Sequence, residues 1–148
     1  KKYHFFLSHK KTHSKQQTRP ADVSLSLTDA LRARGFKGFF DVDNLRNITE
    51  AELKEAVVDS EAMILFLTDE TTQSEWCRNE WLWAKENNVP IRCVVDLHCS
   101  GKSDCLETIM GFPHLLEYPP IDYVDRSRNA VLDKLVLWLG GLKLVHAD

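Results

Sequence analysis

The segment Ala62-Met63-Ile64-Leu65-Phe66-Leu67 is the most apolar run of the chain, and no polar residue interrupts it. A strand with one face in water alternates polar and apolar residues, whereas a continuous apolar run indicates a strand that is covered on both faces. A parallel sheet with helices on both faces provides that environment. The run therefore predicts an α/β fold.

The rest of the chain alternates between strand and helix patterns. Further strands are predicted at Tyr3–Ser8, Phe36–Asp41 and Ile91–Val95, with a short edge strand at His114–Tyr118 that ends at Pro119-Pro120. Apolar residues at helical spacing predict helices around 23–31, after Thr49, over 74–88 and over 131–142, where Gly140-Gly141 should end or distort the last helix. Polar or irregular segments are predicted at 9–20, 41–48 and 98–111. Five strands alternating with helices suit a flavodoxin-like open parallel sheet in the order 2-1-3-4-5.

The bulk properties narrow the possible partners and location. We expect a single domain over residues 1–148, cut from a larger protein. A formal net charge of −3 gives no reason to expect nucleic-acid binding. No apolar run reaches the roughly 20 residues that cross a bilayer, so no membrane partner is expected for this segment. The four cysteines form no CxxC pair, and Cys99 and Cys105 with His98 match no zinc spacing, so we expect reduced thiols, a cytoplasmic protein and no metal.

One acidic residue occupies a helix position where an apolar side chain is expected. At 100° per residue, Glu80 falls on the apolar arc of its helix, which also carries Trp76, Cys77, Trp81, Trp83 and Ala84. A buried carboxylate is costly, so such groups are usually paired, neutralised or functional in a cleft. The alternative is a glutamate at the rim of the apolar face, with its carboxylate in water and its methylene groups on a tryptophan.

Polar residues end the predicted strands. The first four predicted strands end in Ser8, Asp41, Asp69 and Asp96, and ligands of open α/β sheets bind beyond the carboxyl ends of the strands. Glu80 should lie near the same edge, because its helix begins shortly after the third strand. Aspartate also favours turns and caps, which is the preferred explanation for Asp69 and Asp96.

These segments together resemble the Toll/interleukin receptor (TIR) domain family. The resemblance rests on Phe6-Leu7-Ser8, on Gly35-Phe36 through Phe40-Asp41, on the loop to Leu45, on the apolar third strand and on Ser74-Glu75-Trp76-Cys77-Arg78-Asn79-Glu80. It runs from about Tyr3 to Asp96 in consistent order and spacing. The sequence departs from the family at Ile48, where the family often has Gly or Pro, and at His9-Lys10-Lys11, where an Arg is commoner.

The resemblance implies one of two functions. Some family members cleave NAD⁺, and their catalytic glutamate corresponds to Glu80; others are adaptors that recruit further TIR domains and usually lack that glutamate. It therefore favours an NAD⁺ nucleosidase that releases nicotinamide and forms ADP-ribose or a cyclic form, in immune or stress signalling. The alternative is a non-catalytic scaffold that acts through homotypic contacts. NAD⁺ would be the substrate, and no cofactor is expected.

The chemistry is compatible with a single carboxylate, because nicotinamide leaves NAD⁺ as a neutral molecule and needs no proton. Glu80 would stabilise an oxocarbenium-like ribose. Trp76 could stack on the cationic pyridinium, and Lys10 and Lys11 could contact the pyrophosphate, unless they are simply solvated loop charges. Ser8 and Asp41 are the further candidate substrate-binding residues.

The loop from Asp43 to Ile48 is a candidate contact surface between TIR domains. It is polar, with Leu45 and Ile48 as its large apolar residues, and it lies beside the predicted cleft. We expect self-association through this loop to be needed for activity. A surface loop with two half-exposed hydrophobic residues is the alternative.

Overall fold

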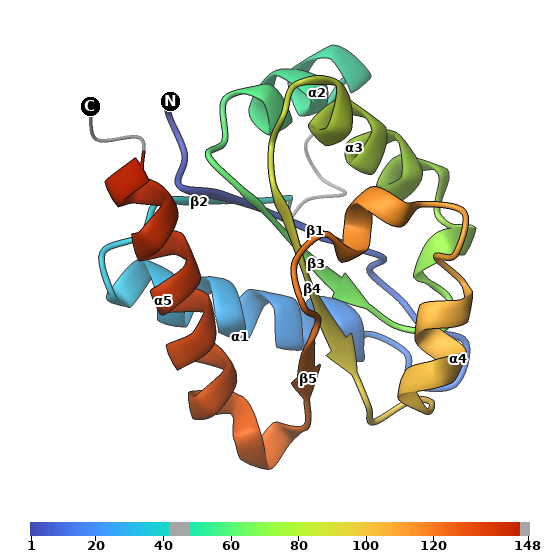
Figure 1. Cartoon of the computed structure of the whole chain (residues 1–148). Helices are drawn as coiled ribbons and strands as arrows, with labels where there is room; N and C mark the ends of the chain where they lie inside the picture. Colours follow the sequence, from blue (N-terminus) through green and yellow to red (C-terminus); the bar gives the residue numbers. More distant parts are fainter. Residues whose placement is uncertain (42–47, 146–148) are drawn as a thin grey trace.

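A computed structural model describes residues 1–41 and 48–145. Its five strands form one parallel sheet in the order β2-β1-β3-β4-β5, which confirms the predicted flavodoxin-like fold (Figure 1). The strands are β1 (Phe5–His9), β2 (Gly38–Phe40), β3 (Met63–Leu67), β4 (Ile91–Asp96) and β5 (Ile121–Tyr123).

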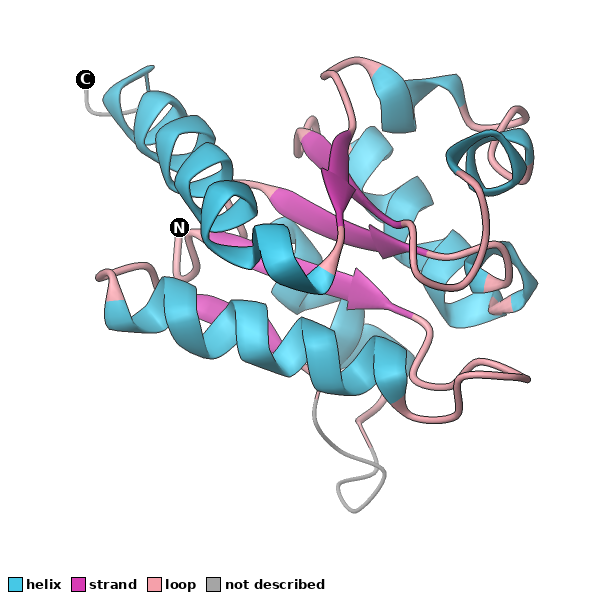
Figure 2. Ribbon diagram, turned by 90° about the horizontal axis from the view of Figure 1, so that it is seen from below, coloured by secondary structure: helices cyan, strands magenta, loops and turns pink. Residues whose placement is uncertain are grey.

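Helices cover both faces of the sheet (Figure 2). The α-helices are α1 (Arg19–Ala33), α2 (Glu50–Val58), α3 (Glu75–Glu86), α4 (Lys102–Glu107) and α5 (Arg128–Val145), and three 3-10 turns lie at Thr71–Gln73, Pro113–Leu116 and Asp125–Ser127. On one face, Met63, Leu65 and Leu67 of β3 pack with α2 and α3. On the other face, Ile64 and Phe66 pack with α1 and α5. Burial of both faces explains why β3 has no polar residue.

Local signals place the helix that carries Glu80. Ser74 is the N-cap of α3, where its hydroxyl accepts a hydrogen bond from the backbone N–H of Cys77 at 3.2 Å. Thr49 caps α2 in the same way by accepting from the N–H of Glu52. The cap sets where α3 begins, and Cys77, Glu80 and Trp81 are buried on one face of this helix.

The predicted edge strand was placed too early in the chain. Residues Pro113–Leu116 form a 3-10 turn in which Leu115 is fully buried, and the edge strand is Ile121–Tyr123. Pro119 and Pro120 precede this strand instead of ending it. A proline lacks the N–H that a sheet ladder needs, so the strand begins only after the pair.

The last helix continues through its two glycines. Helix α5 extends from Arg128 to Val145, although Gly140-Gly141 was predicted to end or distort it. Val131, Leu135 and Leu139 are buried at helical spacing against the sheet, and this packing outweighs the poor helix propensity of glycine. Over the described residues, no helix is long and apolar enough to cross a membrane.

Candidate functional site

A cavity of about 570 Å³ opens at the carboxyl ends of β1 and β2, beside the N-terminus of α3. This volume is within the range of small-molecule sites. Among the predicted site residues, Lys10, Lys11, Asp41, Trp76 and Glu80 line it, together with His9, Thr12, Ile48, Leu53 and Cys77. We refer to it below as the Glu80 cavity. The structure thus brings together residues from four separate segments of the chain.

Glu80 is buried at the inner wall of the Glu80 cavity, with 6% of its surface exposed. The hydroxyl of Ser8 donates a hydrogen bond to Glu80 Oε1 at 2.6 Å. Burial raises the pKa of the Glu80 carboxyl to about 8; the Ser8 hydrogen bond opposes the rise, Asp41 adds to it and Lys11 reduces it. Glu80 is therefore not a rim residue with its carboxylate in water.

Two lysines from the segment after β1 contribute positive charge to the cavity. Lys11 Nζ lies 3.5 Å from Asp41 Oδ2, and both side chains are partly exposed. Lys10 Nζ donates a hydrogen bond to the backbone carbonyl of Thr12 at 2.9 Å. Both cations face a solvent-accessible opening, where an anionic group could reach them.

Trp76 lies at the mouth of the cavity and is 50% exposed, although it was predicted on the apolar arc with Trp81 and Trp83. It is the second residue of α3. Cys77, the next residue, is buried, and burial raises the pKa of its thiol to about 12. A thiolate nucleophile is therefore unavailable there at neutral pH.

His9 is a further residue of the site that the sequence patterns did not indicate. His9 is the last residue of β1, is buried, and stacks on Phe40 with ring centroids 4.8 Å apart. Burial lowers its pKa to about 4, so the imidazole is neutral at physiological pH. Its position directly after Ser8, at the end of a strand, was the available signal.

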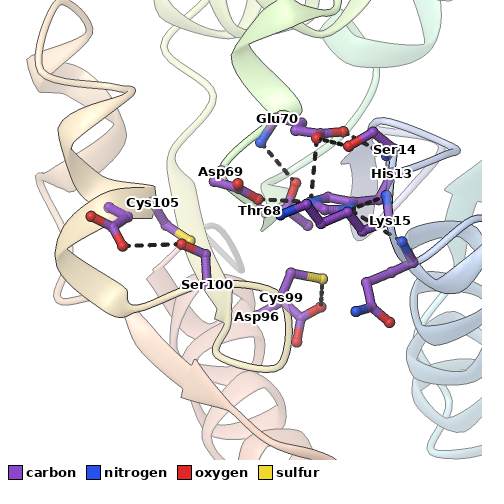
Figure 3. Close-up of polar contacts among 12 residues, drawn as sticks. His13, Ser14, Lys15, Thr68, Asp69, Glu70, Asp96, Cys99, Ser100 and Cys105 are labelled. Carbon is purple, nitrogen blue, oxygen red and sulfur yellow. Dashed lines mark hydrogen bonds and ion pairs between the residues drawn. The ribbon is translucent and has the colours of Figure 1, made fainter.

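A second cluster joins the segment after β1 to the turn after β3 (Figure 3). His13 Nε2 lies 2.8 Å from Asp69 Oδ1, and Nδ1 of the same ring accepts hydrogen bonds from the backbone N–H groups of Lys15 and Gln16. Glu70 accepts hydrogen bonds from both the backbone and the hydroxyl of Ser14.

The hydrogen bonds of His13 decide whether this cluster could hold a metal ion. His13, Asp69 and Glu70 have ligand atoms within 4.8 Å of one another. Because Nδ1 accepts from two amides, the ring proton is on Nε2, which then donates to Asp69 and has no lone pair for a metal. The hydrogen bonds of this cluster therefore join the segment after β1, which carries Lys10 and Lys11, to the turn after β3.

Asp96, at the end of β4, is a structural residue. It is fully buried and accepts hydrogen bonds from Nε and Nη2 of Arg19, both at 3.0 Å. The same guanidinium also bonds Asp125 before α5. Asp96 also accepts a hydrogen bond from the backbone N–H of His98 at 3.1 Å, which is a turn contact of the kind that the sequence favoured. Asp69, in contrast, contacts His13.

Comparison with known proteins identifies the family. The chain is similar to the TIR domains of the activated Roq1 resistosome that directly recognises the pathogen effector XopQ (19% identity, 97% of this chain and 82% of that one, TM-score 0.51). It is also similar to the TIR domain of the Toll-related receptor TRR-2 from Hydra magnipapillata (14% identity, 91% and 95% coverage, TM-score 0.57). A diflavin flavoprotein A3 from Nostoc sp. shares the fold (11% identity, 96% and 95% coverage, TM-score 0.55). No curated protein matches the sequence. A family model described as TIR domain matches residues 5–136, and the chain therefore belongs to the TIR domain family.

Proposed function

We propose that this domain is an NAD⁺ nucleosidase in which Glu80 is the catalytic residue. The observation that carries the proposal is a buried carboxylate in the wall of a cavity of ligand size, with its pKa raised to about 8. Perturbed carboxylates in clefts are candidates for catalysis. A cationic ring bound beside Glu80 would favour its ionised form, since an opposite charge lowers the pKa of a carboxyl group.

The reaction needs only one carboxylate. The bond between ribose C1′ and the pyridinium nitrogen breaks, and its electron pair goes to that nitrogen, which leaves in neutral nicotinamide. The oxocarbenium-like ribose that develops is stabilised by the negative charge of Glu80. A water oxygen then bonds to C1′ and releases a proton, giving ADP-ribose; in a cyclic product, a nucleophilic atom of the same substrate replaces the water.

The other residues of the cavity suit the remaining parts of NAD⁺. Trp76 presents a half-exposed aromatic surface at the cavity mouth, on which the pyridinium could stack. Lys10 and Lys11 offer point charges for the pyrophosphate. Asp41 also lines the cavity and is a candidate hydrogen-bond acceptor for ribose hydroxyl groups.

Signalling by self-association is part of the same proposal. One structure with this fold contains the TIR domains of the activated Roq1 resistosome. The proposed contact is the loop from Asp43 to Ile48, of which residues 43–47 lie outside the described residues and Ile48 lines the cavity. A cytoplasmic location fits the four free cysteines. The alternative, a non-catalytic scaffold, would use the same contacts without nicotinamide release.

The test is nicotinamide release from NAD⁺ by the purified domain and by Glu80→Ala. We expect the variant to keep its fold and to lose about 10²–10³ in rate or more, as is typical when an electrostatic stabiliser is removed. Glu86→Ala is the matched control, because Glu86 is exposed at the end of the same helix. Full activity in Glu80→Ala would refute the role of Glu80, and absence of nicotinamide release by the parent at high protein concentration would favour the scaffold.

A further inference from the structure

Three buried side chains form a line of hydrogen bonds behind the wall of the Glu80 cavity. The indole Nε1 of Trp81 donates to Ser8 Oγ at 3.2 Å, and Ser8 Oγ donates to Glu80 Oε1 at 2.6 Å. Trp81 is fully buried and Ser8 is 1% exposed. Trp81 and Glu80 are consecutive on α3, whereas Ser8 is in β1, so the line joins the helix to the sheet.

When Glu80 is ionised, the donor inventory fixes the direction of these hydrogen bonds. An indole N–H can only donate, so it occupies an acceptor lone pair of Ser8 Oγ. A serine hydroxyl has one proton, and this proton is given to Glu80. Donation by Trp81 polarises the Ser8 O–H bond and strengthens its bond to the carboxylate.

The line leaves the two carboxylate oxygens of Glu80 in different situations. Oε1 is held by Ser8, whereas Oε2 accepts no hydrogen bond from any described residue. Ser8 itself is absent from the lining of the Glu80 cavity, although the sequence predicts it as a candidate substrate-binding residue. A ligand in the cavity would therefore meet Glu80 and not the hydroxyl behind it.

We propose that Ser8 and Trp81 are positioning residues, which hold one oxygen of Glu80 so that the other faces the substrate and which favour the ionised carboxylate. This inference rests on the proposed function. It assigns Ser8 to the support of Glu80 instead of to NAD⁺. It also gives a role to the buried indole N–H of Trp81, which packing of the ring alone would not need.

Other charged or titratable groups around Glu80 determine what a pH measurement can show. Lys10 and Lys11 follow β1, Asp41 follows β2, and Cys77 and Glu75 share α3 with Glu80, while His9 ends β1. The Ser8 hydrogen bond lowers the pKa of Glu80 against the larger effect of burial. Removal of the Ser8 hydroxyl leaves the charges in place and should raise that pKa further above about 8.

The kinetic test compares Ser8→Ala and Trp81→Phe with the parent. We expect kcat of Ser8→Ala to fall roughly 10- to 100-fold with little change in KM, which matches the loss of a hydrogen bond to a charged group. The acidic limb of the kcat/KM profile, which reports the free enzyme, should move to higher pH. Trp81→Phe should move it in the same direction by less.

Matched controls make the same chemical changes away from the cavity. Ser60→Ala removes a buried hydroxyl that donates to the carbonyl of Ala56, at the opposite end of the sheet. Trp138→Phe removes an indole N–H that has no hydrogen-bond partner among the described residues. Neither control should shift the pH profile. A profile that stays in place in Ser8→Ala, or a KM effect without a kcat effect, would overturn the inference.

A measurement without substrate separates this inference from the proposed function. Carbon-13 NMR of glutamate-labelled protein follows the Glu80 carboxyl through its titration in the parent and in each variant. A higher Glu80 pKa in Ser8→Ala and Trp81→Phe, with no change in the controls, supports the positioning role of Ser8 and Trp81 even if the parent releases no nicotinamide. An unchanged Glu80 pKa in Ser8→Ala refutes the positioning role even if the enzyme is active.

Discussion

At the scale of the residue, the burial of Glu80 has a cost that depends on pH. The folded protein holds a proton on this carboxyl up to about pH 8, whereas the unfolded chain releases it near pH 4.5. Between these values the folded state binds more protons, so stability falls as pH rises. Glu80→Gln keeps the acceptor for Ser8 and removes the titration.

We therefore expect Glu80→Gln to melt at a higher temperature than the parent at about pH 8, with a smaller difference at about pH 4.5. Thermal unfolding followed by circular dichroism at both pH values measures this. A destabilised catalytic position is common, because function and stability compete there. Equal melting temperatures of the parent and Glu80→Gln at pH 8 would show that the buried Glu80 carboxylate does not destabilise the fold.

Trp76 and Trp138 provide a second contrast between residues. Trp76 is half exposed at the cavity mouth, whereas Trp138 is partly buried against the core and packs on Tyr118 with ring centroids 5.4 Å apart. Trp76→Ala should raise KM for NAD⁺ about 2- to 30-fold with little change in melting temperature, given the usual strength of cation–π contacts. Trp138→Ala should lower the melting temperature and leave KM unchanged. Kinetics and thermal unfolding of both variants decide the matter, and equal loss of stability in the two would contradict the distinction.

At the scale of the element, α5 contains two glycines that its packing does not need. A Cβ added at Gly140 or Gly141 would meet nothing within 4 Å beyond the helix itself. We expect Gly140→Ala and Gly141→Ala each to raise the free energy of unfolding by about 0.5–1 kcal/mol, the usual gain in a helix interior. Gly38→Ala is the opposite case, because its Cβ would lie 2.1 Å from the ring of Phe5 in the neighbouring strand. Urea unfolding of the three variants measures the effects, and no gain at either helix position would contradict the expectation.

At the scale of the whole molecule, the Glu80 cavity is open to solvent at one edge of the sheet, beside Ile48 and Trp76. A second copy of the domain that covers this edge would exclude water and complete the site. We expect specific activity to rise with protein concentration, and Leu45→Ala, in the proposed contact loop, to weaken the rise. Activity that is independent of concentration, or a Leu45→Ala variant equal to the parent, would contradict assembly-dependent catalysis.

The sequence was sufficient for the fold and for the position of Glu80. The apolar run 62–67 has no alternation, which indicates a strand buried on both faces, and the structure confirms this burial. The structure also confirms the sheet order that was predicted from five strands alternating with helices. Glu80 was visible because helical periodicity is a local property, and a carboxylate on an apolar arc breaks it. Prediction of the edge strand was wrong because short strands near prolines have weak local signals, and the packing of Leu115 decided the segment.

Only the tertiary structure decided how the site is built. Ser8 and Glu80 are 72 positions apart, and His13 and Asp69 are 56 apart, so no local pattern links either pair. Helical periodicity placed Trp76 on the apolar arc, and its half-exposure depends on which other segments pack around the start of α3. Local patterns therefore determined which elements form and which residue is anomalous. The side-chain partners of that residue came from the juxtaposition of α3 with the end of β1, because contacts between distant segments exist only once the chain is packed.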